Sequence, residues 1–107
     1  MGFAVSALLS GALAEHPDYA FAFTGDGSFT MNPQVLFDGV EHGLRACIII
    51  FDNRSMSAIT GLQMDQYRNA YRTSDHVEID YVALANSVKG VLGVHGGRTP
   101  DQFREAL

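Results

Sequence analysis

Two short polar segments of this sequence carry residue types that can hold a metal ion and an anion. Gly25-Asp26-Gly27-Ser28 and Asp52-Asn53-Arg54-Ser55 each follow an apolar run. Asp26 offers a hard carboxylate oxygen and Asn53 an amide carbonyl oxygen, a set that suits Mg²⁺ shared with a diphosphate. The glycines let backbone N–H groups approach an anion closely. Such segments are also ordinary surface turns, so neither is specific by itself.

The two segments form one site only if the runs before them are neighbouring strands. Residues 19–24 are short, apolar and aromatic, and residues 46–51 are a continuous β-branched run. The second pattern is typical of a strand buried on both faces of a parallel sheet. Because ligands of open α/β sheets bind beyond the carboxyl ends of the strands, we expect both segments to converge on one site.

The remaining residues alternate between helical and strand patterns. Asn32 before Pro33, Asp80, and the capping box at residues 99–102 each predict a helix start. Four helices are therefore predicted, over residues 2–14, 33–42, 80–89 and 100–107. A third strand is predicted over residues 91–95. The first helix is apolar nearly all round, which predicts packing on more than one side. Residues 57–78 are polar and aperiodic, and we expect a long excursion with one helical turn.

This alternation predicts an α/β fold, a three-layer αβα arrangement with a mostly parallel sheet. With 107 residues, 47% of them apolar, the chain is expected to be a single domain over residues 1–107. The apolar first helix and the last helix suggest a fold truncated at both ends. We expect another chain to cover the open sheet edge that this leaves.

Composition narrows the function classes. The net charge is −5 and Lys89 is the only lysine, which argues against binding nucleic acid or an anionic membrane surface. Cys47 is the only cysteine, so an internal disulfide and a cysteine-based metal or iron–sulfur site are excluded. The first residues lack a basic signal-peptide region, and no apolar stretch has the length of a membrane-spanning helix. A cytoplasmic protein is expected.

The two polar segments resemble the thiamine pyrophosphate (TPP) motif, in which Gly-Asp-Gly is followed by Asn after some two dozen residues. Here Asn53 lies 27 positions after Asp26, at the end of an apolar strand pattern. Residues 1–4, 80–85 and 99–103 also resemble helices of acetolactate synthase-like decarboxylases. The chain therefore resembles the C-terminal TPP-binding domain of TPP-dependent enzymes over nearly its whole length. This implies the thiamine pyrophosphate-binding αβα fold.

The resemblance implies a role for each matching position. Asp26, the side-chain oxygen of Asn53 and the backbone carbonyl of Ser55 would ligate Mg²⁺. The cofactor-binding residues implied by the motif and its surroundings are Gly25, Gly27 and Ser28 in the first segment, Met56 and Ser57 after the second, and Met1 with Gly2 at the aminopyrimidine ring. Two positions depart from the family pattern: Asp52 stands where many members have Asn, and Ser57 replaces a glycine common in the synthases.

The resemblance assigns no catalytic residue to this chain. In the family a glutamate from a separate pyrimidine-binding domain activates the cofactor, usually across a dimer interface. None of Glu15, Glu41, Glu78 and Glu105 matches its motif. His95, near the expected rim of the sheet, is the strongest acid–base candidate among the histidines. Arg54 is a candidate to pair with Asp52 or a substrate carboxylate, and a structural ion pair is the favoured interpretation. The expected partner is a pyrimidine-binding domain or subunit in a homo- or hetero-oligomer.

The resemblance points to two branches of the family. Residues 25–32 resemble the synthases and decarboxylases that act on small 2-oxo acids, the interpretation we favour. Residues 57–63 resemble the 2-oxoacid:ferredoxin oxidoreductases, including those acting on indolepyruvate, whose clusters would need other subunits. A non-catalytic module that retains the fold is the alternative of another class, although the presence of both Asp26 and Asn53 argues against it.

Overall fold

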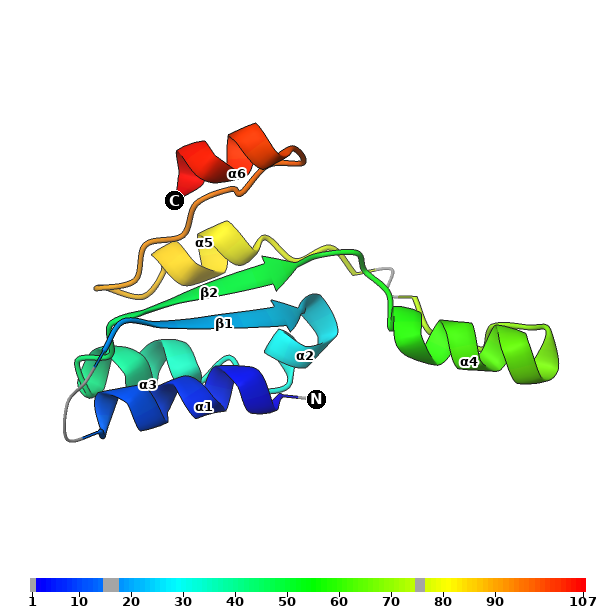
Figure 1. Cartoon of the computed structure of the whole chain (residues 1–107), viewed down its shortest axis with the longest axis horizontal. Coiled ribbons are helices and arrows are strands. Elements are labelled where there is room, and N and C mark those ends of the chain that lie inside the picture. The colour runs from blue at the N-terminus through cyan, green and yellow to red at the C-terminus, as the bar shows by residue number, and fades with distance from the viewer. Residues whose placement is uncertain (1, 15–17, 75–76) are drawn as a thin grey trace.

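The computed structural model describes residues 2–14, 18–74 and 77–107. Six helices and two strands lie in these ranges (Figure 1). In chain order they are α1 (Phe3–Ala12), β1 (Ala20–Gly25), α2 (Asp26–Thr30), α3 (Val35–Glu41), β2 (Ala46–Phe51), α4 (Ser57–Tyr67), α5 (Tyr81–Asn86) and α6 (Pro100–Ala106).

The two strands pair in parallel, as predicted. Their register runs from Ala20 opposite Ala46 to Gly25 opposite Phe51, so the strands end at the same level. The connection between them passes through α2 and α3, which satisfies the need of parallel strands for a long crossover.

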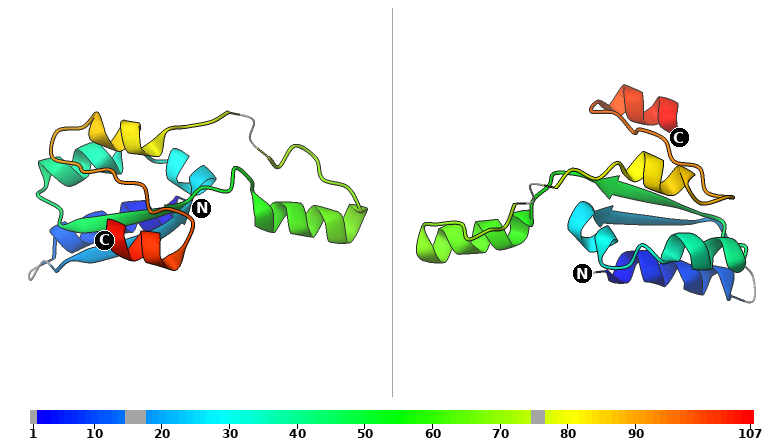
Figure 2. Two further views of the ribbon diagram at one scale, coloured as in Figure 1. Left: turned by 90° about the horizontal axis from the view of Figure 1, so that it is seen from above. Right: turned by 180° about the vertical axis from the view of Figure 1, so that it is seen from behind.

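Helices lie on both sides of the strands. Figures 1 and 2 show α1 and α3 on one side and α6 on the other. The buried core lies on the α1 side and consists of Val5, Phe29, Val35 and Leu36, with Ile48 and Ile50 of β2 packed against it. This α/β arrangement agrees with the predicted αβα class.

The opposite face of the two strands is largely open in the part of the chain that the structure describes. Phe21, Phe23 and Phe51 are 56%, 61% and 60% exposed, and the rings of Phe23 and Phe51 stack 6.5 Å apart. The prediction that residues 46–51 form a strand buried on both faces is therefore wrong: no residue of β2 is fully buried, and Phe51 is exposed. The first helix also differs from expectation, because Val5 is fully buried whereas Phe3 is 80% exposed.

Residues 57–78 differ most from the sequence prediction. Instead of one helical turn they contain α4, an 11-residue helix that extends away from the body of the molecule (Figure 1). Good helix formers such as Leu62 and Met64 favour this helix, and Arg68 ends it in the left-handed conformation, at a φ of 51°. No residue of α4 is buried, which explains why its sequence shows no helical apolar periodicity.

The third predicted strand is absent from the described residues 91–95. The side chain of Asn86 makes the hydrogen bonds that a neighbouring strand would have made. Its Oδ1 accepts from the Gly93 N–H at 2.8 Å, and its Nδ2 donates to the Gly93 carbonyl at 3.1 Å. A Cβ atom at position 93 would lie 2.8 Å from the Val82 carbonyl oxygen, so this segment runs directly against α5. Consistent with this, α5 ends at Asn86 rather than near residue 89.

The predicted helix caps have mixed outcomes. Asp80 and Thr99 cap α5 and α6 as predicted, by accepting hydrogen bonds from the Ala83 and Gln102 amides. The prediction for Asn32 is wrong, because α3 starts two residues later with Gln34 as its N-cap. The Asn32 side chain instead donates to the Ser6 hydroxyl of α1 at 2.5 Å.

Loss of the Phe29 ring is expected to destabilise the domain strongly. Phe29 is 2% exposed, lies in the core and makes an edge contact with Tyr81 at 5.8 Å. Phe29→Ala should lower the free energy of unfolding by about 3–5 kcal/mol through the cavity it leaves. Phe3→Ala is the matched control, because Phe3 is 80% exposed. Urea denaturation measures both, and equal losses in the two variants would contradict this account of the core.

Candidate functional site

The site begins where the two strands end. Gly25 pairs with Phe51, so Asp26 and Asp52 are the residues that directly follow the two paired strands. Helix α2 starts at once after β1 and contacts β2, and the chain leaving β2 starts at the same end of the sheet (Figure 1). The structure therefore brings the two polar segments together at one edge.

Asp26 is a buried carboxylate at this edge. The segment from Gly25 to Ser28 was expected to be a turn, but Asp26 opens the short helix α2 and is only 6% exposed. Among the described residues no side chain forms an ion pair or a hydrogen bond with it. The residue is buried as a whole, but its carboxylate oxygens still reach solvent, since no described side-chain oxygen is both fully buried and without a hydrogen-bond partner. A carboxylate with accessible oxygens at this edge can ligate a cation.

Asn53 is held by two hydrogen bonds within the second segment. Its Oδ1 accepts from the Ser55 N–H at 3.0 Å, and its Nδ2 donates to the Ser57 hydroxyl at 2.9 Å. Arg54, between Asn53 and Ser55, lies in the left-handed region with a φ of 50°. This residue turns the chain so that the Ser55 amide reaches back to the Asn53 side chain.

Arg54 forms a structural ion pair, as expected, but with Glu78 instead of Asp52. Its guanidinium lies 4.0 Å from the Glu78 carboxylate, not beside Asp52, and both side chains are more than half exposed. An exposed ion pair at this distance contributes little to stability.

Met56 and Ser57 were both expected near the phosphates. The Met56 N–H donates to the Thr73 carbonyl at 2.8 Å, so in this conformation it is not available to an anion. Ser57 is the first residue of α4, and its hydroxyl accepts the hydrogen bond from Asn53. A short bridge between Ser55 and Ser74 holds the two arms of this segment together.

The first segment is joined to the start of the chain. Ser28, in α2, accepts a 2.6 Å hydrogen bond from the Gly2 N–H through its hydroxyl oxygen, which leaves the hydroxyl proton free to donate to an anion. Gly2 has a φ of 77°, a conformation that favours glycine. An added Cβ at Gly27 would meet nothing within 4 Å, so the backbone there is open to a ligand. Met1, like His16 and His76, lies outside the described residues.

Sequence reasoning missed Ser6 and Asn32 as neighbours of this site. Asn32 donates to the Ser6 hydroxyl, which in turn donates to the Gly2 carbonyl at 3.4 Å. These bonds connect α1 with the residues after α2. The signal in the sequence is a serine in a helix that is otherwise almost wholly apolar.

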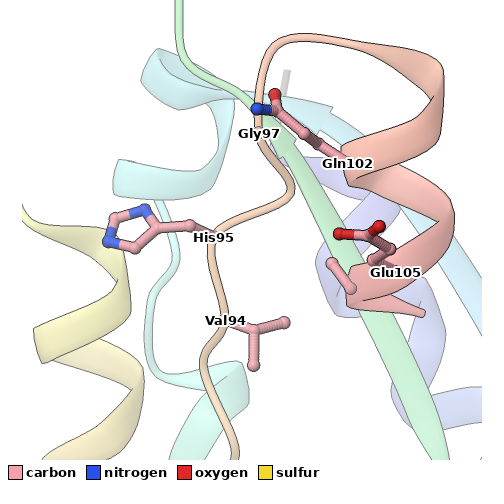
Figure 3. Close-up of a pocket in the computed structure, with 6 residues that line it drawn as sticks. Val94, His95, Gly97, Gln102 and Glu105 are labelled. Carbon is pink, nitrogen blue, oxygen red and sulfur yellow. The ribbon is translucent and has the colours of Figure 1, made fainter.

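His95 and Glu105 do not form a catalytic pair in the part of the chain that the structure describes. His95, Gln102 and Glu105 line a shallow pocket of about 470 Å³ beside α6. In Figure 3 the His95 ring points toward α5, away from Glu105, so the two side chains are not arranged as an acid–base pair. His42 follows the end of α3, as the sequence predicted.

The chemistry of the described donors favours an oxygen-ligated cation. No group of three His, Cys, Asp or Glu side chains in residues 2–14, 18–74 and 77–107 could hold a metal ion. A cation at the sheet edge would therefore combine the Asp26 carboxylate with amide and carbonyl oxygens, the ligand types that Mg²⁺ prefers.

None of the helices in these ranges is long and apolar enough to cross a membrane.

Comparison with known proteins agrees with this geometry. Residues 1–107 match the family model described as thiamine pyrophosphate enzyme, C-terminal TPP binding domain. A 3D-(3,5/4)-trihydroxycyclohexane-1,2-dione hydrolase of Lacticaseibacillus casei is 35% identical over 91 residues, which cover 79% of this chain and 14% of that protein. A hydrolase of the same name from Shouchella clausii is 30% identical, over 100% of the chain and 17% of that protein.

A relative with a different name is similar at the same level. The probable acetolactate synthase large subunit of Methanocaldococcus jannaschii is 32% identical, over 100% of this chain and 18% of that protein. The chain thus spans 14–18% of the length of these curated relatives. Because the family model covers every residue from 1 to 107, the chain belongs to the family of C-terminal TPP-binding domains of thiamine pyrophosphate enzymes.

Proposed function

We propose that this chain binds the Mg²⁺-diphosphate end of thiamine pyrophosphate within an enzyme that acts on a substrate with two adjacent carbonyl carbons. The observation that carries the proposal is that β1 and β2 end at the paired residues Gly25 and Phe51. Asp26 directly follows this pair on the first strand, and Asn53 follows it two residues later on the second. The Asp26 carboxylate supports it, because it has no ion-pair partner among the described residues and its oxygens reach solvent.

Each residue of the site has a defined role in this proposal. Asp26, the Oδ1 of Asn53 and the carbonyl of Ser55 ligate the metal. Gly25 and Gly27 keep the backbone accessible to the diphosphate, and Ser28 donates its hydroxyl proton to it. Gly2, hydrogen-bonded to Ser28, lies at the pyrimidine side.

Thiamine pyrophosphate, when bound, supplies a carbon nucleophile and an electron sink for chemistry at a carbonyl carbon. The part of this chain that the structure describes orients the cofactor and has no residue assigned to activate it. We infer that a pyrimidine-binding domain or subunit contributes the activating glutamate, so this domain is inactive by itself.

The relatives suggest what the carbonyl substrate has in common. The branch that residues 25–32 resemble acts on small 2-oxo acids, and the hydrolases are named for a cyclohexane-1,2-dione. Both substrates carry a ketone carbon next to a second carbonyl carbon, and the ketone carbon is the electrophile. We favour a 2-oxo acid decarboxylase or carboligase, with hydrolysis of a cyclic 1,2-dione as the second candidate. A ferredoxin-linked oxidoreductase rests on the resemblance of residues 57–63 alone.

A cytoplasmic location stays a prediction from the sequence.

Asp26→Asn should remove Mg²⁺-dependent cofactor binding, since ligand charge sets the affinity of such sites. In the complete enzyme we expect thiamine pyrophosphate affinity with Mg²⁺ to fall about 100-fold. Asp38→Asn, in the first turn of α3, is the matched control and should bind like the wild type. Isothermal titration calorimetry with and without Mg²⁺ measures both. Unchanged affinity in the Asp26 variant would contradict the assigned ligand, and a wild type that binds no cofactor would favour the non-catalytic module.

Two probes separate the candidate reactions in the complete enzyme. Pyruvate should release carbon dioxide if the enzyme is a 2-oxo acid decarboxylase or carboligase, and cyclohexane-1,2-dione should open to a carboxylic acid if it is a hydrolase. Carbon dioxide release and carboxylate formation are measured in parallel, with Asp26→Asn as the inactive control. Turnover of the dione alone would exclude the favoured reaction, and turnover of neither would count against both.

The exposed aromatic face of the two strands should take part in association. Phe21, Phe23 and Phe51 form this face, and an exposed apolar patch of this kind marks an interaction surface. The isolated chain should sediment with a concentration-dependent coefficient, and replacing Phe23 and Phe51 by serine should weaken the association. Phe37→Ser, on α3 with 55% exposure, is the control. A monomer that is insensitive to dilution would contradict this proposal.

A further inference from the structure

We infer that Ser57 is a positioning residue for Asn53, because its hydroxyl holds the Asn53 amide with the carbonyl oxygen free to ligate a divalent cation. The inference rests on the proposed function and concerns a residue whose side chain does not itself touch the metal. It assigns a role to the position that departs from the synthase pattern, since a glycine there offers no side chain for such a contact.

The hydrogen bonds around Asn53 define the orientation of its amide. Its Nδ2 donates to the Ser57 hydroxyl at 2.9 Å, and its Oδ1 accepts from the Ser55 N–H at 3.0 Å. A side-chain amide oxygen has two lone pairs, so one lone pair of Oδ1 remains for a metal ion. The two bonds hold opposite ends of the same amide group.

Two anchors matter because the amide torsion of asparagine is soft. The final torsion of this side chain has a broad energy minimum, so one hydrogen bond leaves the plane of the amide poorly defined. Asn53 and Ser57 are both exposed, and water competes with each bond. Without the Ser57 hydroxyl, the amide keeps only the Ser55 contact, and the direction of its Oδ1 is less well defined.

Ser57 is itself held in place by the base of α4. The residue before it, Met56, donates its N–H to the Thr73 carbonyl at 2.8 Å. One turn further along the helix, the Thr60 hydroxyl donates to the Thr73 hydroxyl at 2.6 Å, and Thr73 is 8% exposed. The anchor for Asn53 is therefore held by a partly buried contact, although the bond to Asn53 lies at the surface.

The decisive experiment compares two substitutions of the same shape. Ser57→Val and Ser57→Thr differ only in a methyl group against a hydroxyl, so any common effect on packing cancels. The apparent Mg²⁺ dissociation constant is measured by calorimetry on the complete enzyme at a fixed concentration of thiamine pyrophosphate. Ser57→Val should bind Mg²⁺ about 10-fold or more weakly, the usual effect of losing a partner of a metal ligand. Ser57→Thr should lie within about threefold of the wild type, since its hydroxyl restores the acceptor.

The controls separate this inference from folding and from the proposed function. Ser87→Ala, which removes a hydroxyl bonded to the Leu84 carbonyl of its own helix, should leave Mg²⁺ affinity unchanged. The melting temperature of Ser57→Val without metal should stay within about 2 °C of Ser57→Thr. Equal Mg²⁺ affinity of the valine and threonine variants overturns the positioning role. If Asp26→Asn also keeps its affinity, the metal site itself is wrong, whereas loss in Asp26→Asn alone rejects only the role of Ser57.

Discussion

The register of the parallel pair β1 and β2 is the constraint on which the rest of the site depends. Hydrogen bonds between parallel strands fix the register from Ala20 opposite Ala46 to Gly25 opposite Phe51. A slip of one residue would turn every inward side chain of a strand to the other face. Such a slip would also separate Asp26 from Asn53 along the strand axis, so the same pairing that builds the core sets the relative position of the two oxygen donors.

The core beside these strands explains why Asp26 is so firmly placed. Asp26 and Phe29 lie three residues apart in α2 and so share one face of the helix. Phe29 is 2% exposed and packs against Tyr81 of α5. The free energy that buries the Phe29 ring also keeps the Asp26 carboxylate at the sheet edge. There it forms no ion pair with any described residue. A bound divalent cation would supply a partner.

The sequence predicted the parts of the fold that depend on local chemistry and on burial. The parallel strands, the caps at Asp80 and Thr99 and the α/β class follow from apolar runs and side-chain caps, and the structure shows them. The missed features depend on contacts distant in sequence or on exposed surfaces. Helix α4 buries no residue and so leaves no periodic signal, Asn32 bonds to Ser6, and Asn86 takes the hydrogen bonds that a strand at Gly93 would make. The convergence of the two polar segments could be predicted, whereas the partners of the Asn53 amide could not.

The two halves of the site are held by different kinds of interaction. Asp26 is held by the burial of its helix beside the hydrophobic core. Asn53 is fixed by hydrogen bonds at the surface, where water competes for each donor and acceptor. The exposed half therefore loses more conformational entropy than the buried half when its oxygen is fixed on a metal. A second anchor on the Asn53 amide reduces that cost, which gives the hydroxyl of Ser57 a function that glycine at this position cannot perform.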